Sequence, residues 1–287
     1  MKSLFHSLYQ FSELKNDSFH FSCFLTERFE IMFYDFIIFL NHFCLVLFMS
    51  GKKREKMIIT IDGSSWTGKS SSAKALAKML GYQYLNTGAM FRAIGYFVKQ
   101  KGLKEEKDII GALKDVTMEF KLVQGESRLF LNSEDVNEQI TSNEVVSLAS
   151  KVAGIPAVRE KLLQLQRHIA KEGGFIVEGR DTGTAVFPDA DWKFFLDASM
   201  DIKVKRYFKM LPPEEKTKHP PGEVRQIITD IDARDRSRPV GPLTKAKDAI
   251  LYDNSDSPSA EQDAMVMWYY ITKSEEMIHN LNNLHKN

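Results

Sequence analysis

The strongest constraint in this sequence is the segment GSSWTGKS at residues 63–70, which matches the pattern G-x-x-x-x-G-K-[S/T] at every specified position. A short apolar segment, residues 57–62, precedes it, and residues 69–80 repeat apolar side chains at helical spacing. Glycines let a backbone turn wrap closely around an anion, and the start of a helix favours negative charge. The segment therefore predicts a phosphate-binding loop between a strand and a helix, and with it the binding of a nucleoside triphosphate.

Two side chains of this loop have expected roles of their own. Lys69 is expected to reach the β and γ phosphates of ATP and to act in catalysis. The Ser70 hydroxyl is expected to ligate Mg²⁺, together with phosphate oxygens and water. The predicted ATP-binding residues are Gly63, Ser64, Ser65, Trp66, Thr67, Gly68, Lys69, Ser70 and Ser71.

The remainder of the chain alternates between strand and helix patterns. The predicted strands cover 57–62, 82–86, 175–177, 193–196 and 249–252, and the predicted helices cover 69–80, 87–101, 143–153, 156–171, 200–211, a stretch from about 223, and 259–281. Thr87 is expected to cap the second helix and Gly102 to end it. Between residues 115 and 136 the apolar period changes to two, with a turn at Gly125, which predicts a small antiparallel insert. Repeated alternation predicts an α/β fold with a mostly parallel sheet covered on both faces.

Composition argues against several classes of protein. The 39 basic and 38 acidic residues nearly cancel, which argues against a nucleic-acid partner. The two cysteines, Cys23 and Cys44, leave the main body without a disulfide framework or a cysteine-based zinc site, and this usage fits a reducing compartment. The seven histidines are scattered without an H-x-x-x-H pair, which argues against a zinc enzyme.

Residues 1–56 differ from the rest of the chain. They hold 11 of the 20 phenylalanines, and the long apolar run at 31–49 is interrupted by Asp35. A membrane helix needs about 20 mostly apolar residues, and a central aspartate costs roughly 2.5–3.5 kcal/mol. We expect a leader that is dispensable or not translated, with the true start at Met49 or Met57. A membrane anchor is the alternative.

Several arginines stand at the ends of predicted elements. They are Arg92, Arg159 and Arg180, and a further group occupies residues 235–238. A guanidinium pairs bidentately with phosphate oxygens, so arginines that converge on one pocket suit a second phosphorylated substrate facing ATP. Arg180 directly follows a buried strand pattern, and ligands of open α/β sheets bind outside the carboxyl ends of the strands.

Five segments together resemble the bacterial cytidylate kinases. They are IDGSSWTGKS at 61–70, LNTGAMFR at 85–92, SKVAGIPAVR at 150–159, EGRDTGTAVFPDA at 178–190 and DRSRPVGPL at 235–243. They stand in the order of that family, and the resemblance runs from residue 57 to about residue 275. It implies phosphorylation of CMP and dCMP by ATP with Mg²⁺, in pyrimidine nucleotide metabolism, by a monomeric cytoplasmic enzyme.

The resemblance also implies a fold and its parts. These are a P-loop NTPase three-layer α/β fold with a parallel five-stranded sheet, covering residues 57–287. A small antiparallel NMP-binding insert is expected at about 104–148, and a mobile lid at about 206–224. Closure of the lid over ATP would exclude water from the transfer.

The site residues implied by the resemblance follow by position. Lys69, Arg180 and Arg206 would be catalytic, Arg206 as part of the lid. Those implied at the CMP phosphate are Thr87, Arg92, Arg159 and Arg180. Those implied at the cytosine ring are Ser150, Arg180 and Asp181. Those implied at the ribose and phosphates are Asp235 and Arg238, and Phe91 completes the CMP-binding set.

Four places depart from the usual pattern of the family. The loop reads Ser-Ser-Trp at 64–66, where the family usually has Pro, Ala and Gly, and Phe91 replaces a tyrosine. The basic run at 203–207 ends in one arginine where the family often has two. Ile231 stands where an arginine near the ribose is common, so we expect a weaker sugar network unless an arginine beside Asp235 fills that role.

Two alternatives stay open from the sequence. The same scaffold could phosphorylate another small acceptor, such as UMP or a non-nucleotide alcohol. It could also be a nucleotide-binding or regulatory protein without turnover, an alternative that the departures in the lid keep open. Measurement of ADP release across several acceptors separates these possibilities.

Overall fold

The computed structural model describes residues 56–211, 216 and 220–284. The chain divides into two units, Met1–Arg54 and Glu55–Asn287, and every described residue belongs to the second. The expected leader lies outside the described residues, except for its last residue, so its role stays a prediction. Within the described ranges, no helix is long and apolar enough to cross a membrane.

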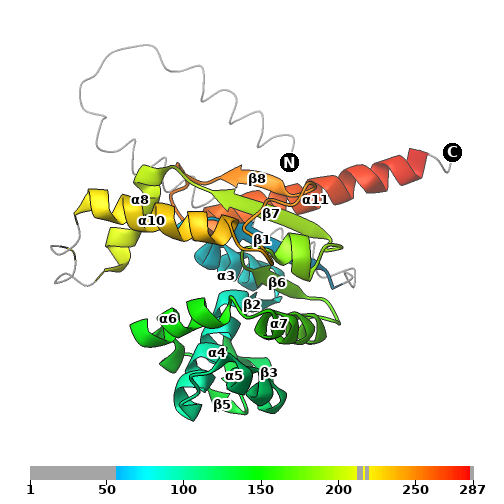
Figure 1. Ribbon diagram of the computed structural model, residues 1–287. Coiled ribbons are helices and arrows are strands. Elements are labelled where there is room, and N and C mark those ends of the chain that lie inside the picture. Colours follow the sequence, from blue (N-terminus) through cyan, green and yellow to red (C-terminus); the bar gives the residue numbers. More distant parts are fainter. Residues whose placement is uncertain (1–55, 212–215, 217–219, 285–287) are drawn as a thin grey trace. The chain divides into compact units, whose positions relative to one another are not determined.

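Five parallel strands form the central sheet, in the order β2-β6-β1-β7-β8 (Figure 1). They are β1 (Ile58–Gly63), β2 (Gln83–Asn86), β6 (Phe175–Glu178), β7 (Trp192–Asp197) and β8 (Ile250–Asp253). The predicted parallel five-stranded sheet is confirmed, with each strand within one residue of its expected bounds. The carboxyl ends of all five strands meet at one edge, where ligands of such sheets bind.

Helices cover both faces of the sheet. The helices α3 (Lys69–Leu80) and α11 (Ala260–Leu284) share one core with the sheet, whereas α4 (Thr87–Lys101) and α7 (Pro156–Ile169) share another. The strand β6 contributes to both cores: Ile176 lies in the core with α3, and its neighbours Phe175 and Val177 lie in the core with α4. This division follows from the strand period, because successive side chains point to opposite faces.

The start of α4 differs from the expectation in one respect. The N-cap is Asn86, whose side chain accepts a hydrogen bond from the Ala89 backbone N–H at 2.9 Å. The expected cap, Thr87, instead donates its hydroxyl to the Glu178 carbonyl at 2.9 Å, so the prediction was wrong by one residue. The predicted end is confirmed, because Gly102 is left-handed and its N–H meets the last carbonyls of the helix.

A three-stranded antiparallel sheet follows α4, as predicted. The sheet consists of β3 (Met118–Val123), β4 (Glu126–Leu131) and β5 (Glu134–Asp135). Before it come α5 (Glu106–Ala112) and the 3₁₀ turn η1 (Leu113–Asp115), and after it come the 3₁₀ turn η2 (Gln139–Thr141) and α6 (Asn143–Val152). Gln124 and Gly125 both have positive φ, the geometry of a tight two-residue hairpin turn. The insert is attached to the main sheet by the Ser127 hydroxyl, which donates to the Tyr84 carbonyl at 2.6 Å.

Three further elements complete the described chain. They are the π-helical turn η3 (Thr182–Val186), α8 (Met200–Met210) and α10 (Pro221–Arg236). The helices α8 and α10 pack on each other through Val204, Val224 and Ile228. The expected lid at about 206–224 falls on the end of α8, the start of α10 and residues outside the described ranges, so its mobility stays a prediction.

Candidate active site

The predicted phosphate-binding loop lies between the end of β1 and the start of α3. A β-carbon on Gly63 would overlap the Leu196 carbonyl of β7, so this turn can pass so close to the neighbouring strand only with glycine. Lys69 is 5% exposed and donates from Nζ to the Ser64 carbonyl at 2.9 Å. Burial, reinforced by the positive charge of Arg180, lowers the pKa of Lys69 to about 7. The loop therefore holds a buried cation where ATP phosphates are expected.

Ser70 opens the first turn of α3 beside a cluster of polar side chains. Its hydroxyl forms a hydrogen bond with the Tyr84 hydroxyl, which in turn donates to Oε2 of Glu178 at 2.6 Å. Burial and the Glu178 carboxylate raise the pKa of Tyr84 well above its ordinary value. Among the described residues, no group of three or more His, Cys, Asp or Glu side chains forms a metal site. Mg²⁺ can still be held here, because it is usually bound by one or two protein oxygens, water and substrate phosphates.

Three residues of α8 contact the loop or its supports. Arg206 donates from Nη1 to the Thr67 carbonyl at 2.9 Å and to Oδ1 of Asn254 at 2.9 Å. Lys203 is paired with Asp197 at 2.8 Å, and the Tyr207 ring lies against Trp66. The residue expected in the lid, Arg206, is thus held against the phosphate-binding loop in this structure.

One carboxylate connects this loop to the turn after β6. Asp62 accepts hydrogen bonds from the Thr182 backbone N–H at 2.9 Å, from the Thr182 hydroxyl at 2.8 Å and from the Gly183 N–H at 2.8 Å. Burial raises the pKa of Asp62 to about 6, although these hydrogen bonds act in the opposite direction. The Asp62 carboxylate therefore stands directly before the phosphate-binding loop. It also fixes the π-helical turn that follows Arg180 and Asp181.

Arg180 lies between the loop and a second charged group. Its Nε donates to Oδ2 of Asp235 at 2.8 Å, and its Nη2 lies 3.4 Å from the Ser65 hydroxyl of the loop. Arg238 pairs with the other carboxylate oxygen of Asp235. Asp235 is 4% exposed, so its charge is balanced by two guanidinium groups in a largely dry setting.

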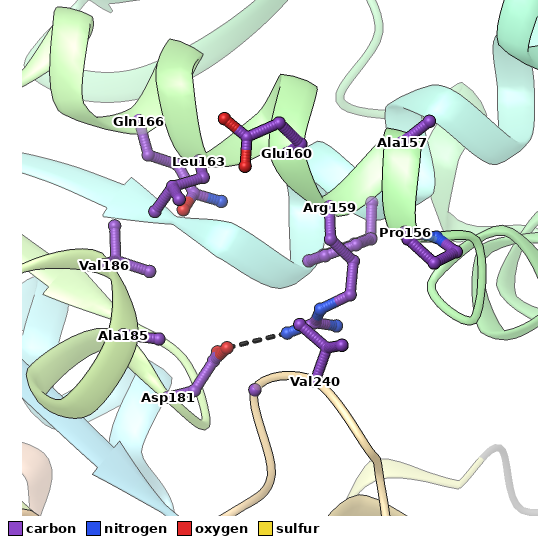
Figure 2. A pocket seen from close by; sticks show the side chains of 12 residues that line it. Pro156, Ala157, Arg159, Glu160, Leu163, Gln166, Asp181, Ala185, Val186 and Val240 are labelled. Carbon is purple, nitrogen blue, oxygen red and sulfur yellow. Dashed lines mark hydrogen bonds and ion pairs between the residues drawn. The ribbon is translucent and has the colours of Figure 1, made fainter.

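A cavity of about 400 Å³ opens beside these arginines (Figure 2). Its lining residues are Phe91, Pro156, Ala157, Arg159, Glu160, Leu163, Gln166, Asp181, Ala185, Val186, Val240 and Gly241. Arg159 donates from Nη2 to Oδ2 of Asp181 at 2.7 Å, and its guanidinium lies 5.4 Å from the centre of the Phe91 ring. Nε of Arg159 is buried and has no hydrogen-bond partner among the described residues. The cavity thus combines apolar walls with two acidic side chains, Glu160 and Asp181, and one basic side chain, Arg159.

Comparison with known proteins decides the family. The family model described as cytidylate kinase matches residues 59–269, which is most of the chain. The chain belongs to the cytidylate kinase family.

Individual relatives in that family cover the same region. Cytidylate kinase from Pseudothermotoga lettingae is 43% identical over 203 residues, which are 70% of this chain and 87% of the relative. Cytidylate kinase from Actinobacillus succinogenes is 39% identical over 230 residues, covering 76% of this chain and 100% of the relative. Among solved structures, shikimate kinase from Bacteroides thetaiotaomicron aligns over 75% of this chain and 98% of its own, at 10% identity and a TM-score of 0.40.

The structure brings several of the expected residues of a cytidylate kinase site together. Thr87 and Arg92 start α4 beside Glu178, and burial lowers the pKa of Arg92 while that carboxylate opposes the shift. Phe91 lines the cavity from the same helix. Ser150 is exposed on α6 and is not among the residues that line the cavity. The expectation that Ser150 contacts the cytosine ring stays untested.

Sequence reasoning missed several supporting residues of this site. Asp62 directly precedes the motif, and Glu178 directly precedes the Gly-Arg-Asp segment, so adjacency to a motif was an available signal. Asp232 lies one helical turn before Asp235 and accepts the Ser65 backbone N–H at 2.8 Å. No local pattern pointed to Asn254, whose Nδ2 donates to the Thr67 carbonyl at 2.8 Å across 187 residues of chain.

Proposed function

We propose that this chain transfers the γ-phosphoryl group of ATP to CMP and dCMP, giving ADP with CDP or dCDP. The observation that carries the proposal is the place of Arg180. This residue is paired with Asp235, lies 3.4 Å from Ser65 of the ATP loop, and stands next to Asp181 of the cavity. A guanidinium in that position can contact phosphates of donor and acceptor at once, which phosphoryl transfer requires.

The ion pair of Arg159 and Asp181, which lines the cavity, suits cytosine. The 4-amino group of cytosine is a donor that a carboxylate such as Asp181 can accept. The ring nitrogen N3 and O2 are acceptors, and Nε of Arg159 is a buried donor without a partner among the described residues. Uracil reverses both features, because its N3 is a donor and its O4 an acceptor. Arg159 was expected at the phosphate, but its pairing with Asp181 favours a role at the base.

The chemistry itself needs mainly positioning and neutralisation of charge. Lys69 would neutralise charge on the transferred group, and Arg92 and Arg180 would hold the acceptor phosphate in line with it. Arg206 would hold the loop through the Thr67 carbonyl. These are interactions with charge that develops during transfer, which gives electrostatic preorganisation its large effect on rate.

Mg²⁺ fits the oxygen donors of this site. We propose that the Ser70 hydroxyl holds it with phosphate oxygens and water, as expected from the sequence. The ion would supply positive charge that offsets the charge of the phosphate groups during transfer. We also propose, as expected from the sequence, that the enzyme is monomeric and cytoplasmic and has no nucleic-acid partner. Sedimentation tests the oligomeric state, and cell fractionation tests the location.

A coupled assay for ADP with CMP, dCMP, UMP, AMP and shikimate as acceptors tests the function. We expect turnover with CMP and dCMP and at least about tenfold lower kcat/KM with UMP, because a buried donor or acceptor left unpaired costs roughly 1–3 kcal/mol. Asp181→Asn is the informative variant, since an amide can donate as well as accept and should narrow the gap between CMP and UMP. Preferred turnover with UMP, AMP or shikimate by the unaltered protein would overturn the proposal.

A further inference from the structure

Trp66 has an unusual backbone conformation within the phosphate-binding loop. Its φ is +62°, in the left-handed region, where a β-carbon comes too close to the following carbonyl. Few residues other than glycine, asparagine and aspartate adopt this conformation, and for a bulky side chain it is an outlier. The other two residues of the loop with positive φ, Gly63 and Gly68, are both glycines. Something outside the loop must therefore hold Trp66 in place.

The support comes from α8 and α10. The rings of Trp66 and Tyr207 have their centres 4.7 Å apart and meet edge to face at 64°, a favourable aromatic geometry. Trp66 is half-buried against the small core formed by Val204, Val224 and Ile228. The indole ring of Trp66 thus packs against α8 and α10, while the backbone of Trp66 is part of the phosphate-binding loop.

Tyr207 is part of a wider contact between one face of α8 and the loop. Lys203, Arg206 and Tyr207 are spaced i, i+3 and i+4, so they share a face of the helix. Lys203 is bonded to Asp197, whose Oδ1 accepts the Ser64 hydroxyl at 2.7 Å, and Arg206 donates to the Thr67 carbonyl at 2.9 Å. Because the Trp66 ring lies against Tyr207, this face of α8 contacts residues 64, 66 and 67 of the loop. Each contact is either direct or passes through one intervening side chain.

We propose that the contact between Trp66 and Tyr207 is a positioning device that holds the backbone of the phosphate-binding loop in its ATP-binding conformation. The backbone N–H groups of the loop must converge on the phosphates, and the left-handed residue at 66 sets their direction. Without Tyr207, the strained residue is free to relax to a more common conformation, and the N–H groups diverge. The inference rests on ATP being the ligand of the loop, as in the proposed function.

The test is a double-mutant cycle on ATP affinity. The four proteins are the unaltered chain, Tyr207→Ala, Trp66→Gly and the double variant, and the dissociation constant of Mg·ATP is measured by calorimetry without acceptor. We expect Tyr207→Ala to weaken ATP binding about 3- to 10-fold, the range of an aromatic pair. In the Trp66→Gly background the same change should have an effect below about twofold, because glycine needs no support in the left-handed region.

Two controls separate this role from general stability. Tyr207→Phe keeps the ring and should keep the affinity of the unaltered protein, and the KM for CMP should stay unchanged in Tyr207→Ala. Tyr207→Leu replaces the alanine variant if the latter does not give a native circular dichroism spectrum. Equal losses from Tyr207→Ala in both backgrounds, or no loss in the unaltered background, would overturn the proposal. ATP binding without turnover of CMP would instead count against the proposed function alone.

Discussion

Gly241 lies so close to the carboxylate of Asp181 that a β-carbon on the glycine would overlap Oδ2. The same β-carbon would overlap Nη2 of Arg159, the other half of the ion pair. The φ of Gly241 is +60°, a conformation that other residues adopt at a cost. The backbone at this glycine thus forms the wall against which the pair of Arg159 and Asp181 rests.

Gly241→Ala should therefore separate Arg159 from Asp181. We expect KM for CMP to rise about tenfold or more, since a charged hydrogen bond is worth roughly 1.5–3 kcal/mol, while kcat changes much less. Gly125→Ala is the matched control, because Gly125 also has a positive φ, of +83°, and nothing lies within contact distance of a β-carbon there. Steady-state kinetics with CMP varied at saturating ATP measure both. An unchanged KM in Gly241→Ala would mean that the wall does not constrain the pair.

Lys69→Ala should lower kcat by two to three orders of magnitude. The loss of one preorganised charge contact to a transferred group costs roughly 3–4 kcal/mol. Lys78→Ala makes the same change on the exposed side of the same helix and should leave kcat near that of the unaltered protein. Near-normal turnover in a correctly folded Lys69→Ala protein would remove Lys69 from the catalytic site.

The affinity for ATP should fall as the pH rises above about 7. The pKa of Lys69 is lowered to about 7 in the free protein, whereas bound phosphates favour the charged form and raise it again. Above pH 7, binding must therefore take up a proton, which weakens it by up to about tenfold per pH unit.

Calorimetry at pH 6 and pH 8.5, in buffers of different ionisation enthalpy, counts this proton. Lys69→Arg is the control, since arginine stays charged throughout and any pH dependence left in it comes from other groups, such as ATP itself and Asp62. Equal pH dependence in both proteins would show that Lys69 does not titrate in this range.

Ile231→Arg should lower KM for CMP about 2- to 10-fold, with a larger gain on CMP than on dCMP. Ile231 lies on α10 one turn before Asp235, so a guanidinium there reaches the region assigned to the ribose. Arg234 and Arg236 are exposed, and the carboxylate of Asp235 is held instead by Arg180 and Arg238. Steady-state kinetics with both acceptors measure the change. Equal KM values before and after the substitution would mean that Arg180 and Arg238 already complete the hydrogen-bond network around Asp235.

Residues 1–48 should be dispensable. The unit that carries the described fold begins after Arg54, and the family match begins at residue 59. We expect a chain that starts at Met49 to remain in the supernatant on centrifugation and to keep full kcat and KM for both substrates. Loss of activity on removal of residues 1–48, or recovery of the native protein with membranes, would contradict this proposal.

Local patterns predicted the elements around the phosphate-binding loop well. A strand, two glycines and a helix with one apolar face fall within 25 residues of each other, so β1 and α3 follow from periodicity and backbone freedom alone. The antiparallel insert was equally accessible, because a period of two and a glycine turn define a hairpin locally.

The contacts that assemble the site were not accessible in this way. Asp62 is bonded to Thr182, 120 positions away, and Arg159 is paired with Asp181, a contact that no local pattern indicated. Thr87 was expected to cap α4, but its hydroxyl is bound by a carbonyl of β6, which leaves the cap to Asn86. Each of these outcomes depends on which strands become neighbours, and a local pattern carries no information about that.

The division of the sheet into two cores has a consequence for how such enzymes diverge. Phe91 and Arg159, which line the cavity, stand on α4 and α7 of one core, whereas α3, which continues the ATP loop, packs in the other. Substitutions of cavity residues on α4 and α7 therefore change the packing on one face of the sheet, while the core that contains α3 on the other face keeps its packing. An ancestral kinase with this layout could exchange one acceptor for another without first losing its hold on ATP.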